Sequence, residues 1–380
     1  MKNRVKIITA ALAVGMAATL AGCGGCGSCA GCGGETSTYT LTRSNWFTGT
    51  SYNGIQPSFV EGHEKFSKEK ITYDVNYDKD VASNAYFELE YSKGTFTTEF
   101  YAVKDWASRV ASPIPAGYAP EKADEVVYYY RTELSISVKY TLKTGDKASS
   151  DPFNDSVVTE SYFRAAGKNL QPVYSKQVVK STSPANYQPT TLQAAYQQID
   201  VTYENFYNDS CTKLISYSTE NGKTESKEYD KLDKLDHTLF DNSSLYIAVR
   251  AMKLSSGLSE PVNLFSAAAG GISAYAIVGS DASLTEQERS DFTKILSDEN
   301  VGLYIPSPEN DKGVPATAVT VSYAGGNLHG TTQTIWYASI LNEDNNVSRA
   351  TMLKLSIPLS FGLGTLNYTL KEVSSTLWNG

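Results

Sequence analysis

The stretch Val126-Val127-Tyr128-Tyr129-Tyr130-Arg131-Thr132-Glu133-Leu134-Ser135-Ile136-Ser137-Val138-Lys139-Tyr140-Thr141-Leu142 decides the fold class of this 380-residue chain. From position 133 onward, polar and apolar residues alternate strictly. Leu134, Ile136, Val138, Tyr140 and Leu142 lie on one side of an extended chain, and Glu133, Ser135, Ser137, Lys139 and Thr141 lie on the other. Because successive strand residues point to opposite faces, the stretch predicts a long strand with one buried and one solvated face. Such strands are typical of antiparallel sheets.

The same two-residue period recurs along the chain, in segments separated by polar or glycine-rich turns. These segments cover residues 71–77, 85–91, 96–102, 157–163, 170–180, 199–203, 213–218, 224–229, 319–323, 331–339, 353–361 and 366–370. Turns at 92–94, 167–169 and Asn221-Gly222 predict three hairpins, and Asn-Gly is a strong signal for a tight turn. Gly362 and Gly364 bracket a bend that predicts a closing hairpin.

One helix is predicted to begin at Asp241, whose carboxylate can accept hydrogen bonds from the free backbone N–H groups of the first turn. Leu245, Val249 and Met252 then share one apolar stripe, and Gly257 ends the helix. We expect this stripe of an amphipathic helix to pack against the sheet.

A second helix is predicted from Ser283 to about Leu296, opened by the capping-box pattern Ser283-Leu284-Thr285-Glu286. Most of its residues are polar, so it should be peripheral. The predicted fold is therefore mainly β: a large curved antiparallel sheet, half-barrel-like, packed on one amphipathic helix and carrying a second, peripheral helix.

The N-terminus has the composition of an export signal: three basic residues, an apolar run from Ile7 to Leu20, and small residues before a cysteine. The sequence Leu20-Ala21-Gly22-Cys23 resembles the lipobox of bacterial lipoproteins. That resemblance implies that residues 1–22 are removed and that Cys23 carries the lipid, palmitate among the candidate acyl chains. The mature protein is then expected on the extracytoplasmic face of the cell membrane, with membrane lipid as its partner through Cys23.

Residues 23–35 are predicted to be a glycine- and cysteine-rich tether, and residues 36–380 a β-rich domain with a possible sub-boundary near 105–124. Cys23, Cys26, Cys29 and Cys32 have a spacing that metal sites use, but only Gly, Ser and Ala lie between them, which offers no shell around a metal. We therefore predict no metal and no cofactor. With Cys211 alone in the body, disulfides cannot cross-link the fold.

The charge balance excludes one large class of partners. The chain has 33 basic and 41 acidic residues, and loss of three basic residues with the signal takes the formal net charge from −8 to −11. Nucleic-acid binding needs clustered Lys and Arg, so we predict no nucleic-acid partner.

The order of elements from about 125 to 373 resembles uncharacterised bacterial envelope proteins related to the periplasmic lipoprotein carriers. The resemblance rests on long strands, the capped helix from Asp241 to Arg250, and strands that close with Met352-Leu353-Lys354-Leu355 and the glycine bend. It implies a curved antiparallel sheet that wraps around helices and encloses an apolar groove, and it supplies no catalytic residues.

Three groups of residues have the types that catalytic or metal sites use. Cys211 and His237 could form a nucleophile and base, but a buried structural cysteine and an exposed loop histidine explain them better. Glu88 and Glu90 could be paired acids of a glycosidase or the solvated side of a strand. The segment Asn342-Glu343-Asp344-Asn345-Asn346 could bind calcium or be a polar hairpin tip. We predict no catalytic residue.

Three functions compete. The first is a lipid-anchored, non-catalytic envelope protein that holds an apolar ligand or contacts an envelope component. The second is a carbohydrate-binding or adhesive module that uses Trp46, Trp106, Trp336 and Tyr128 to Tyr130 as exposed aromatics. The third is an extracellular hydrolase, which would need carboxylates that face each other in a cleft.

Overall fold

A computed structural model gives the structure of the chain between Lys65 and Asn379. It describes residues 65–79, 87–122, 124–143, 145, 147–166, 169–184, 191–192, 196–251, 259–296, 305, 316–323, 332–341, 347–359 and 364–379. The predicted signal peptide, the tether with Cys23, and Trp46 lie outside the described residues, as do Met252 and the acidic segment 342–346.

The described chain forms one sheet of 16 strands. The strands are β1 (Lys65–Asp78), β2 (Phe87–Tyr91), β3 (Gly94–Lys104), β4 (Val126–Leu142), β5 (Phe153–Ala166), β6 (Asn169–Pro184), β7 (Tyr196–Tyr207), β8 (Lys213–Glu220), β9 (Lys223–Asp230), β10 (Leu239–Asp241), β11 (Ser259–Ser266), β12 (Gly271–Ala282), β13 (Ala316–Tyr323), β14 (Gln333–Leu341), β15 (Val347–Pro358) and β16 (Thr365–Asn379). Their order in the sheet is β10-β11-β12-β13-β14-β15-β16-β1-β3-β4-β5-β6-β7-β8-β9, with β2 beside β4. The predicted mainly β, curved antiparallel fold is confirmed.

Strand β4 lies in the middle of this sheet, between β3 and β5. Its even-numbered residues from Tyr128 to Leu142 are all buried and face the interior. The odd-numbered residues from Glu133 to Thr141 are exposed or half-buried. The alternation read from the sequence therefore corresponds to the two faces of a strand in an antiparallel sheet.

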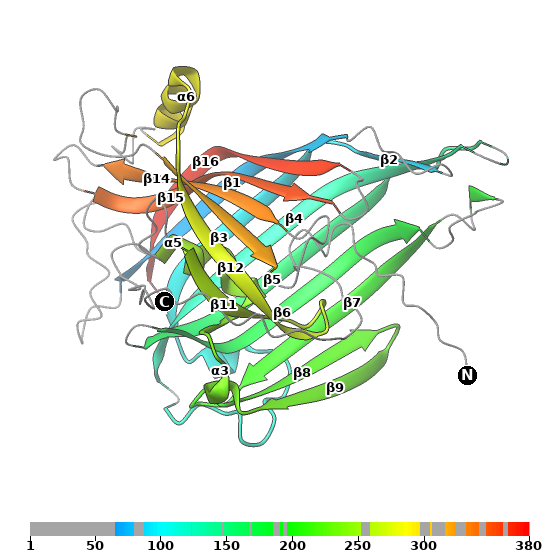
Figure 1. Ribbon diagram of the computed structural model, residues 1–380. Helices are drawn as coiled ribbons and strands as arrows, with labels where there is room; N and C mark the ends of the chain where they lie inside the picture. Colours follow the sequence, from blue (N-terminus) through cyan, green and yellow to red (C-terminus); the bar gives the residue numbers. More distant parts are fainter. Residues whose placement is uncertain are drawn as a thin grey trace, which may run out of the picture.

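The sheet curves until its two ends approach each other, which gives the barrel-like shell of Figure 1. Five buried side chains from the two ends pack together, and we call them the seam cluster: Tyr207, Leu214, Leu232, Leu239 and Phe265. Across the seam, Lys227 Nζ and Tyr229 OH of β9 donate to Gly270 O, at 3.1 and 3.3 Å. β9 thus contacts β11 and the turn before β12 through side chains, without a backbone ladder.

The predicted hairpin over 85–102 is wrong. β2 pairs with the second half of β4, from Val138 to Leu142, and β3 pairs with the first half, from Val126 to Ser135. The two short strands therefore lie end to end along one long neighbour, and 92–94 joins them without reversing the chain. A Cβ at Gly94 would lie 2.8 Å from the Ser135 carbonyl oxygen, so the junction needs glycine.

The other predicted hairpins are confirmed. β5 pairs with β6, β8 with β9, and β15 with β16, each antiparallel. At the turn between β8 and β9, Asn221 and Gly222 have φ of 51° and 74°. Both are in the left-handed region that a tight hairpin turn requires and that Asn and Gly tolerate.

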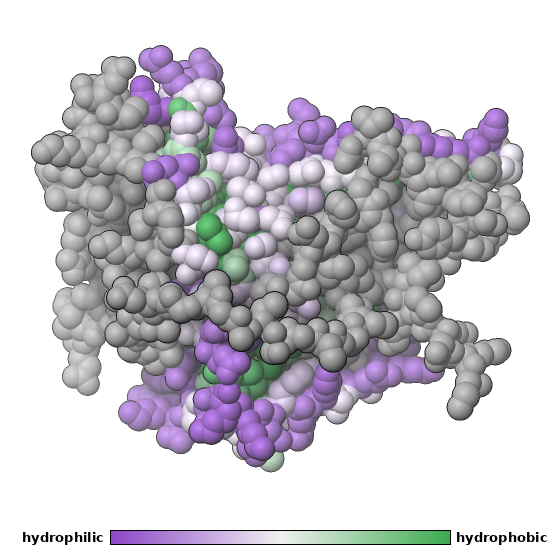
Figure 2. Space-filling view, viewed as in Figure 1, coloured by the Kyte–Doolittle hydropathy of each residue, from purple (hydrophilic) through white to green (hydrophobic). Residues whose placement is uncertain are grey.

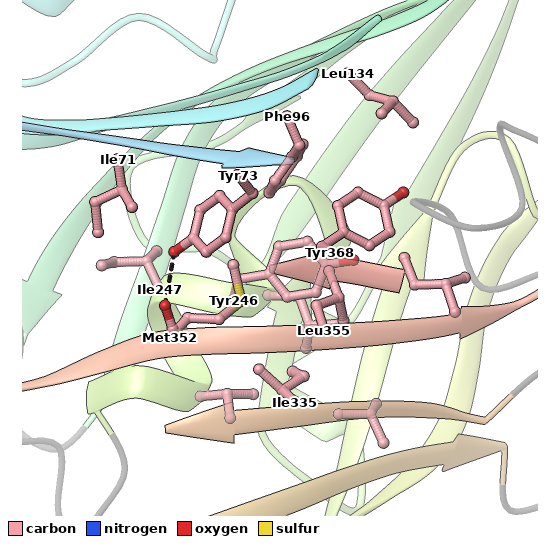
Figure 3. Close-up of a cluster of buried hydrophobic side chains, with 14 of the residues drawn as sticks. Ile71, Tyr73, Phe96, Leu134, Tyr246, Ile247, Ile335, Met352, Leu355 and Tyr368 are labelled. Carbon is pink, nitrogen blue, oxygen red and sulfur yellow. Dashed lines mark hydrogen bonds between the residues drawn. The ribbon is translucent and has the colours of Figure 1, made fainter. Parts of the chain in front are cut away.

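The helix predicted after Asp241 consists of η2 (Asn242–Ser244), a 3₁₀ turn, followed by α5 (Leu245–Ala251). Asp241 caps it as predicted, because its side chain accepts from Ser243 N. The expected amphipathic character is wrong: every side chain from Leu245 to Arg250 is buried. α5 lies inside the curved sheet and meets side chains from β1, β3, β15 and β16 in Figure 3. Enclosure on all sides explains why no face of α5 is exposed and why its one charged residue, Arg250, is buried.

The second helix, α6 (Glu286–Leu296), begins three residues later than predicted. Its capping box uses Thr285 and Glu288 instead of Ser283 and Glu286: Glu288 N donates to Thr285 Oγ1 and Thr285 N donates to Glu288 Oε2, at 3.2 and 2.9 Å. Phe292 and Leu296 are buried, and the rest forms the hydrophilic patch over α6 in Figure 2. The helix is peripheral, as predicted.

The segment proposed as a sub-boundary, 105–124, joins two strands that pair directly, β3 and β4. It contains the short helix α3 (Trp106–Arg109) and packs on the outer face of the sheet. Trp106 Nε1 donates to Glu125 Oε1 at 3.0 Å, and Arg164 bridges Glu125 and Asp209. Among the described helices, none has the length and apolar character needed to cross a membrane.

Candidate functional site

The inner face of β4 to β8 carries polar side chains in two rows, which we call the polar belt. Across neighbouring strands, Ser161 pairs with Ser175, Ser175 with Asn205, and Asn205 with Ser216. One step along the strands, Thr132 pairs with Thr159 and Thr159 with Gln177. Because residues opposite each other in a ladder share a face, all seven side chains point into the shell.

The belt is buried. The seven residues that form it are between 0 and 7 % exposed. Some of its groups are paired: Thr132 Oγ1 and Thr159 Oγ1 lie 2.6 Å apart, and Asn205 Nδ2 donates to Ser175 Oγ at 2.9 Å. Three are not: Ser161 Oγ, Gln177 Nε2 and Asn205 Oδ1 have no hydrogen-bond partner among the described residues. Such groups are uncommon in native interiors, because an unmade hydrogen bond costs about 1 to 3 kcal/mol.

Asp241 is hydrogen-bonded to the belt at Ser175. Its Oδ2 accepts from Ser175 Oγ at 2.7 Å and from Tyr207 OH at 2.6 Å, while Oδ1 accepts from Ser243 N at 2.8 Å. Burial raises the pKa of Asp241, and these hydrogen bonds counter part of that rise. The node holds η2 against β4, β5 and β6.

A second group of polar atoms lies near Asp155, two residues along β5 from the apolar Val157. Asp155 is fully buried and accepts hydrogen bonds from Thr182 N and Oγ1, the latter at 2.7 Å. Burial raises the pKa of Asp155 to about 6, although the bonds from Thr182 oppose the rise. On Ser181, the neighbour of Thr182, Oγ has no partner among the described residues.

Two tyrosine hydroxyls in the same interior are also unpaired. Tyr91 and Tyr368 are 7 and 1 % exposed, and their OH groups have no partner among the described residues. Burial raises the pKa of both tyrosines well above its ordinary value, so both hydroxyls keep their protons and can donate. The interior therefore offers donors as well as acceptors.

The buried cation of α5 is neutralised. Arg250 Nη1 and Nη2 donate to Glu69 Oε1 and Oε2, at 2.5 and 3.1 Å, in a bidentate pair. Burial lowers the pKa of Arg250, but the Glu69 carboxylate more than offsets this effect and the pKa is raised. Arg250 Nε has no hydrogen-bond partner among the described residues, but the Glu69 carboxylate neutralises the guanidinium, so Arg250 offers no net charge to an anionic ligand.

The residues singled out for catalysis do not form a site. Cys211 lies at the edge of the seam cluster, and burial raises the pKa of its thiol to about 11. The thiol is therefore protonated near neutral pH, which makes it a poor nucleophile. His237 is exposed, and only its carbonyl oxygen has a described bond, from Asn263 Nδ2. Nothing among the described contacts joins the cysteine to the histidine.

Glu88 and Glu90 lie on the outward side of β2, where Glu88 is paired with Lys79. Both side chains lie on the solvent-facing side of the strand, and they do not face each other across a cleft. The segment 342–346, considered for calcium, is outside the described residues. In the part of the chain that the structure describes, no three His, Cys, Asp or Glu side chains gather in a metal-binding group.

The aromatics considered as an exposed platform are divided between the two faces. Tyr128 and Tyr130 belong to the interior, whereas Tyr129 lies on the outer face. There it is part of an aromatic ladder across six strands, with neighbouring rings 4.8 to 6.1 Å apart: Tyr101, Tyr129, Tyr162, Tyr174, Phe206 and Tyr217. Trp106 packs on this ladder and is 1 % exposed, and Trp336 is half-buried beside Lys354.

The polar belt was not predicted from the sequence. On β5 and β6 the outward residues Tyr162 and Tyr174 are apolar and the inward Ser161 and Ser175 are polar. A period-two pattern assigns such serines to the solvent face. One sequence signal for the belt was available. Tyrosines recur at matching positions on neighbouring strands, which indicates that the outer face of the sheet is buried as well as the inner face.

No family model and no curated protein matches this chain. Among solved structures, it is similar to the crystal structure of a β-barrel-like protein of a domain of unknown function, DUF1849, from Brucella abortus. The chains are 9% identical, the match covers 82% of this chain and 98% of that chain, and the TM-score is 0.40.

Proposed function

We propose that this protein is a lipid-anchored envelope protein that binds an apolar or amphiphilic ligand inside its curved sheet and performs no chemistry on it. The observation that carries the proposal is the set of unpaired polar atoms inside an apolar interior. Small-molecule sites are typically mostly apolar, with a few convergent polar groups that orient the ligand.

The anchoring half of the proposal rests on Leu20-Ala21-Gly22-Cys23. Several acyl chains, each contributing about 0.8 kcal/mol per buried CH₂, would hold the mature protein at a membrane. The test is fractionation of cells that express Cys23→Ala. We expect the variant to leave the membrane fraction, with Cys26→Ala as the matched control that remains there. A Cys23→Ala protein that stays membrane-bound at the wild-type level would contradict lipid anchoring.

The binding half is tested on the purified chain with 1-octanol as a minimal amphiphile, by isothermal titration calorimetry. We expect saturable binding with a negative heat-capacity change, because apolar surface is buried. Heat of dilution alone, with no shift of the thermal unfolding midpoint at saturating octanol, would exclude the binding function.

A further inference from the structure

We propose that the polar belt binds the uncharged, hydroxyl-bearing head of an amphiphilic ligand, such as the sugar of an alkyl glycoside or glycolipid. This inference rests on the proposed binding function and names its ligand class. The head would lie against β5, β6 and β7, and the apolar part would face the side chains of β1, β15 and β16 that surround α5.

The geometry of the belt suits a compact polyol. Ser161, Ser175 and Asn205 are consecutive partners across three strands, and Gln177 lies on the same face of β6. Neighbouring strands are about 4.8 Å apart, so one ring with several hydroxyls can reach groups on two strands at once. A lone hydroxyl could reach fewer of them.

The unpaired atoms require a ligand that both donates and accepts. Gln177 Nε2 is a donor, Asn205 Oδ1 is an acceptor, and the hydroxyl of Ser161 can be either. A carboxylate or phosphate accepts only and would leave Asn205 Oδ1 unpaired, while an ammonium donates only and would leave Gln177 Nε2 unpaired. A hydroxyl group does both, so a polyol can satisfy the whole set.

The charges around the belt favour a neutral head. Asp241 contacts Ser175 directly, so a carboxyl group already borders the belt. Arg250, which could have attracted an anion, is held in its bidentate pair with Glu69. An anionic head would meet this carboxyl group without a free cation from α5, and a sugar meets no such penalty.

The test compares three probes on the purified full chain: n-octyl β-D-glucoside below its critical micelle concentration, 1-octanol, and methyl β-D-glucoside. We expect the octyl glucoside to bind at least tenfold more tightly than octanol. The double substitution Ser161→Ala with Gln177→Met should lower the glucoside affinity about tenfold, as for one or two lost hydrogen bonds, and lower the octanol affinity less, because a lone hydroxyl reaches fewer of these groups. The matched control is Ser156→Ala, on the outward face of β5.

The outcomes separate the two proposals. If octanol and octyl glucoside bind equally, the belt inference is wrong and the binding function stands. If neither binds, the proposed function fails. Removal of unpaired buried groups should not unfold the protein, so the double variant should be at least as stable as the wild type. If this stable variant binds the glucoside as tightly as the wild type does, internal water alone satisfies the hydrogen-bonding groups of the belt. That result would also overturn the inference.

Discussion

Asp155 shows how one buried carboxyl makes the stability of this protein depend on pH. Burial raises its folded-state pKa to about 6 from the ordinary 3.8. Below pH 4 the carboxyl is protonated in both states. As the pH rises from about 4 to 6 the unfolded chain releases the proton first, so stability falls through this window.

The substitution Asp155→Asn should remove this pH dependence and keep an acceptor for Thr182. Between pH 4 and pH 8 the wild type should lose about 2 kcal/mol of unfolding free energy relative to the variant, from a rise of about two pKa units at a fully buried site. Urea unfolding of both proteins across this range measures the difference. Parallel pH profiles for the two proteins would show that Asp155 is ionised in the folded state as readily as in the unfolded chain.

The Glu69–Arg250 pair also contributes to stability at the scale of single residues, because it places opposite charges in an apolar interior. Replacement of Arg250 by Met should cost about 3 to 5 kcal/mol, since it removes the guanidinium that neutralises the buried Glu69 carboxylate. The double variant with Glu69→Gln should recover most of that loss. Chemical unfolding in a double-mutant cycle measures both values.

The exposed pair Lys371–Asp74 provides the control for that cycle. Lys371→Met should leave the unfolding midpoint unchanged, because solvent screens an exposed pair. If Arg250→Met also left the unfolding midpoint unchanged, the buried pair would contribute nothing to the stability of the fold.

At the scale of elements, α5 acts as the central core element of the shell. Leu245 is 1 % exposed and belongs to the same cluster as the inner faces of β1, β3 and β15. Leu245→Ala should therefore lower the unfolding free energy by about 2 to 5 kcal/mol, through lost burial and the cavity that remains. Leu284→Ala, a half-buried position beside α6, should cost clearly less in the same thermal or urea unfolding experiment. A wild-type midpoint for Leu245→Ala would mean that α5 is not a core element.

The strand pattern could be predicted wherever a strand has one wet and one dry face. The second half of β4 is such a strand, and there alternation was sufficient. The hairpins β5–β6 and β8–β9 were predicted from their turn residues. The β2–β3 junction could not be predicted, because Ser92-Lys93-Gly94 has turn composition. It is the length of β4 and the approach of Gly94 to Ser135 that align the two strands end to end.

The same reasoning explains what was missed in the interior. α5 was predicted from Asp241 and its apolar residues, but enclosure by a closed shell is a property of strands far away in the sequence. The pairing of β1 with β16 creates that enclosure and joins residues about 300 positions apart, for example Ile71 with Val373. Local patterns carry no information on such a pairing, nor on the inward direction of the belt serines.

For the whole molecule, the seam is the region where the shell is least continuous. β9 is an edge strand whose residues are almost all exposed and polar, with Lys and Glu along it. Charged edge strands resist pairing with other sheets, which suits an edge that meets the other end of the sheet without a backbone hydrogen-bond ladder. The seam cluster therefore holds the two ends of the sheet together mainly through apolar contacts.

Phe265 is the centre of that cluster: it is fully buried, and its ring lies 6.3 Å from Tyr207 and 5.4 Å from Tyr229. We expect Phe265→Ala to release the two ends of the sheet while the middle stays folded. Amide hydrogen exchange should then accelerate in β8 to β11 and remain slow in β4 to β6, since local opening does not require global unfolding.

Phe96→Ala is the matched control, because Phe96 is equally buried but packs on Tyr73, Tyr246 and Tyr368 in the middle of the shell (Figure 3). It should accelerate exchange in all strands together, through a loss of about 3 to 5 kcal/mol of global stability. The two substitutions remove the same atoms, so only their positions differ. If Phe265→Ala accelerated exchange as uniformly as Phe96→Ala does, the seam would be part of one cooperative core, and the shell would open only when the whole sheet unfolds.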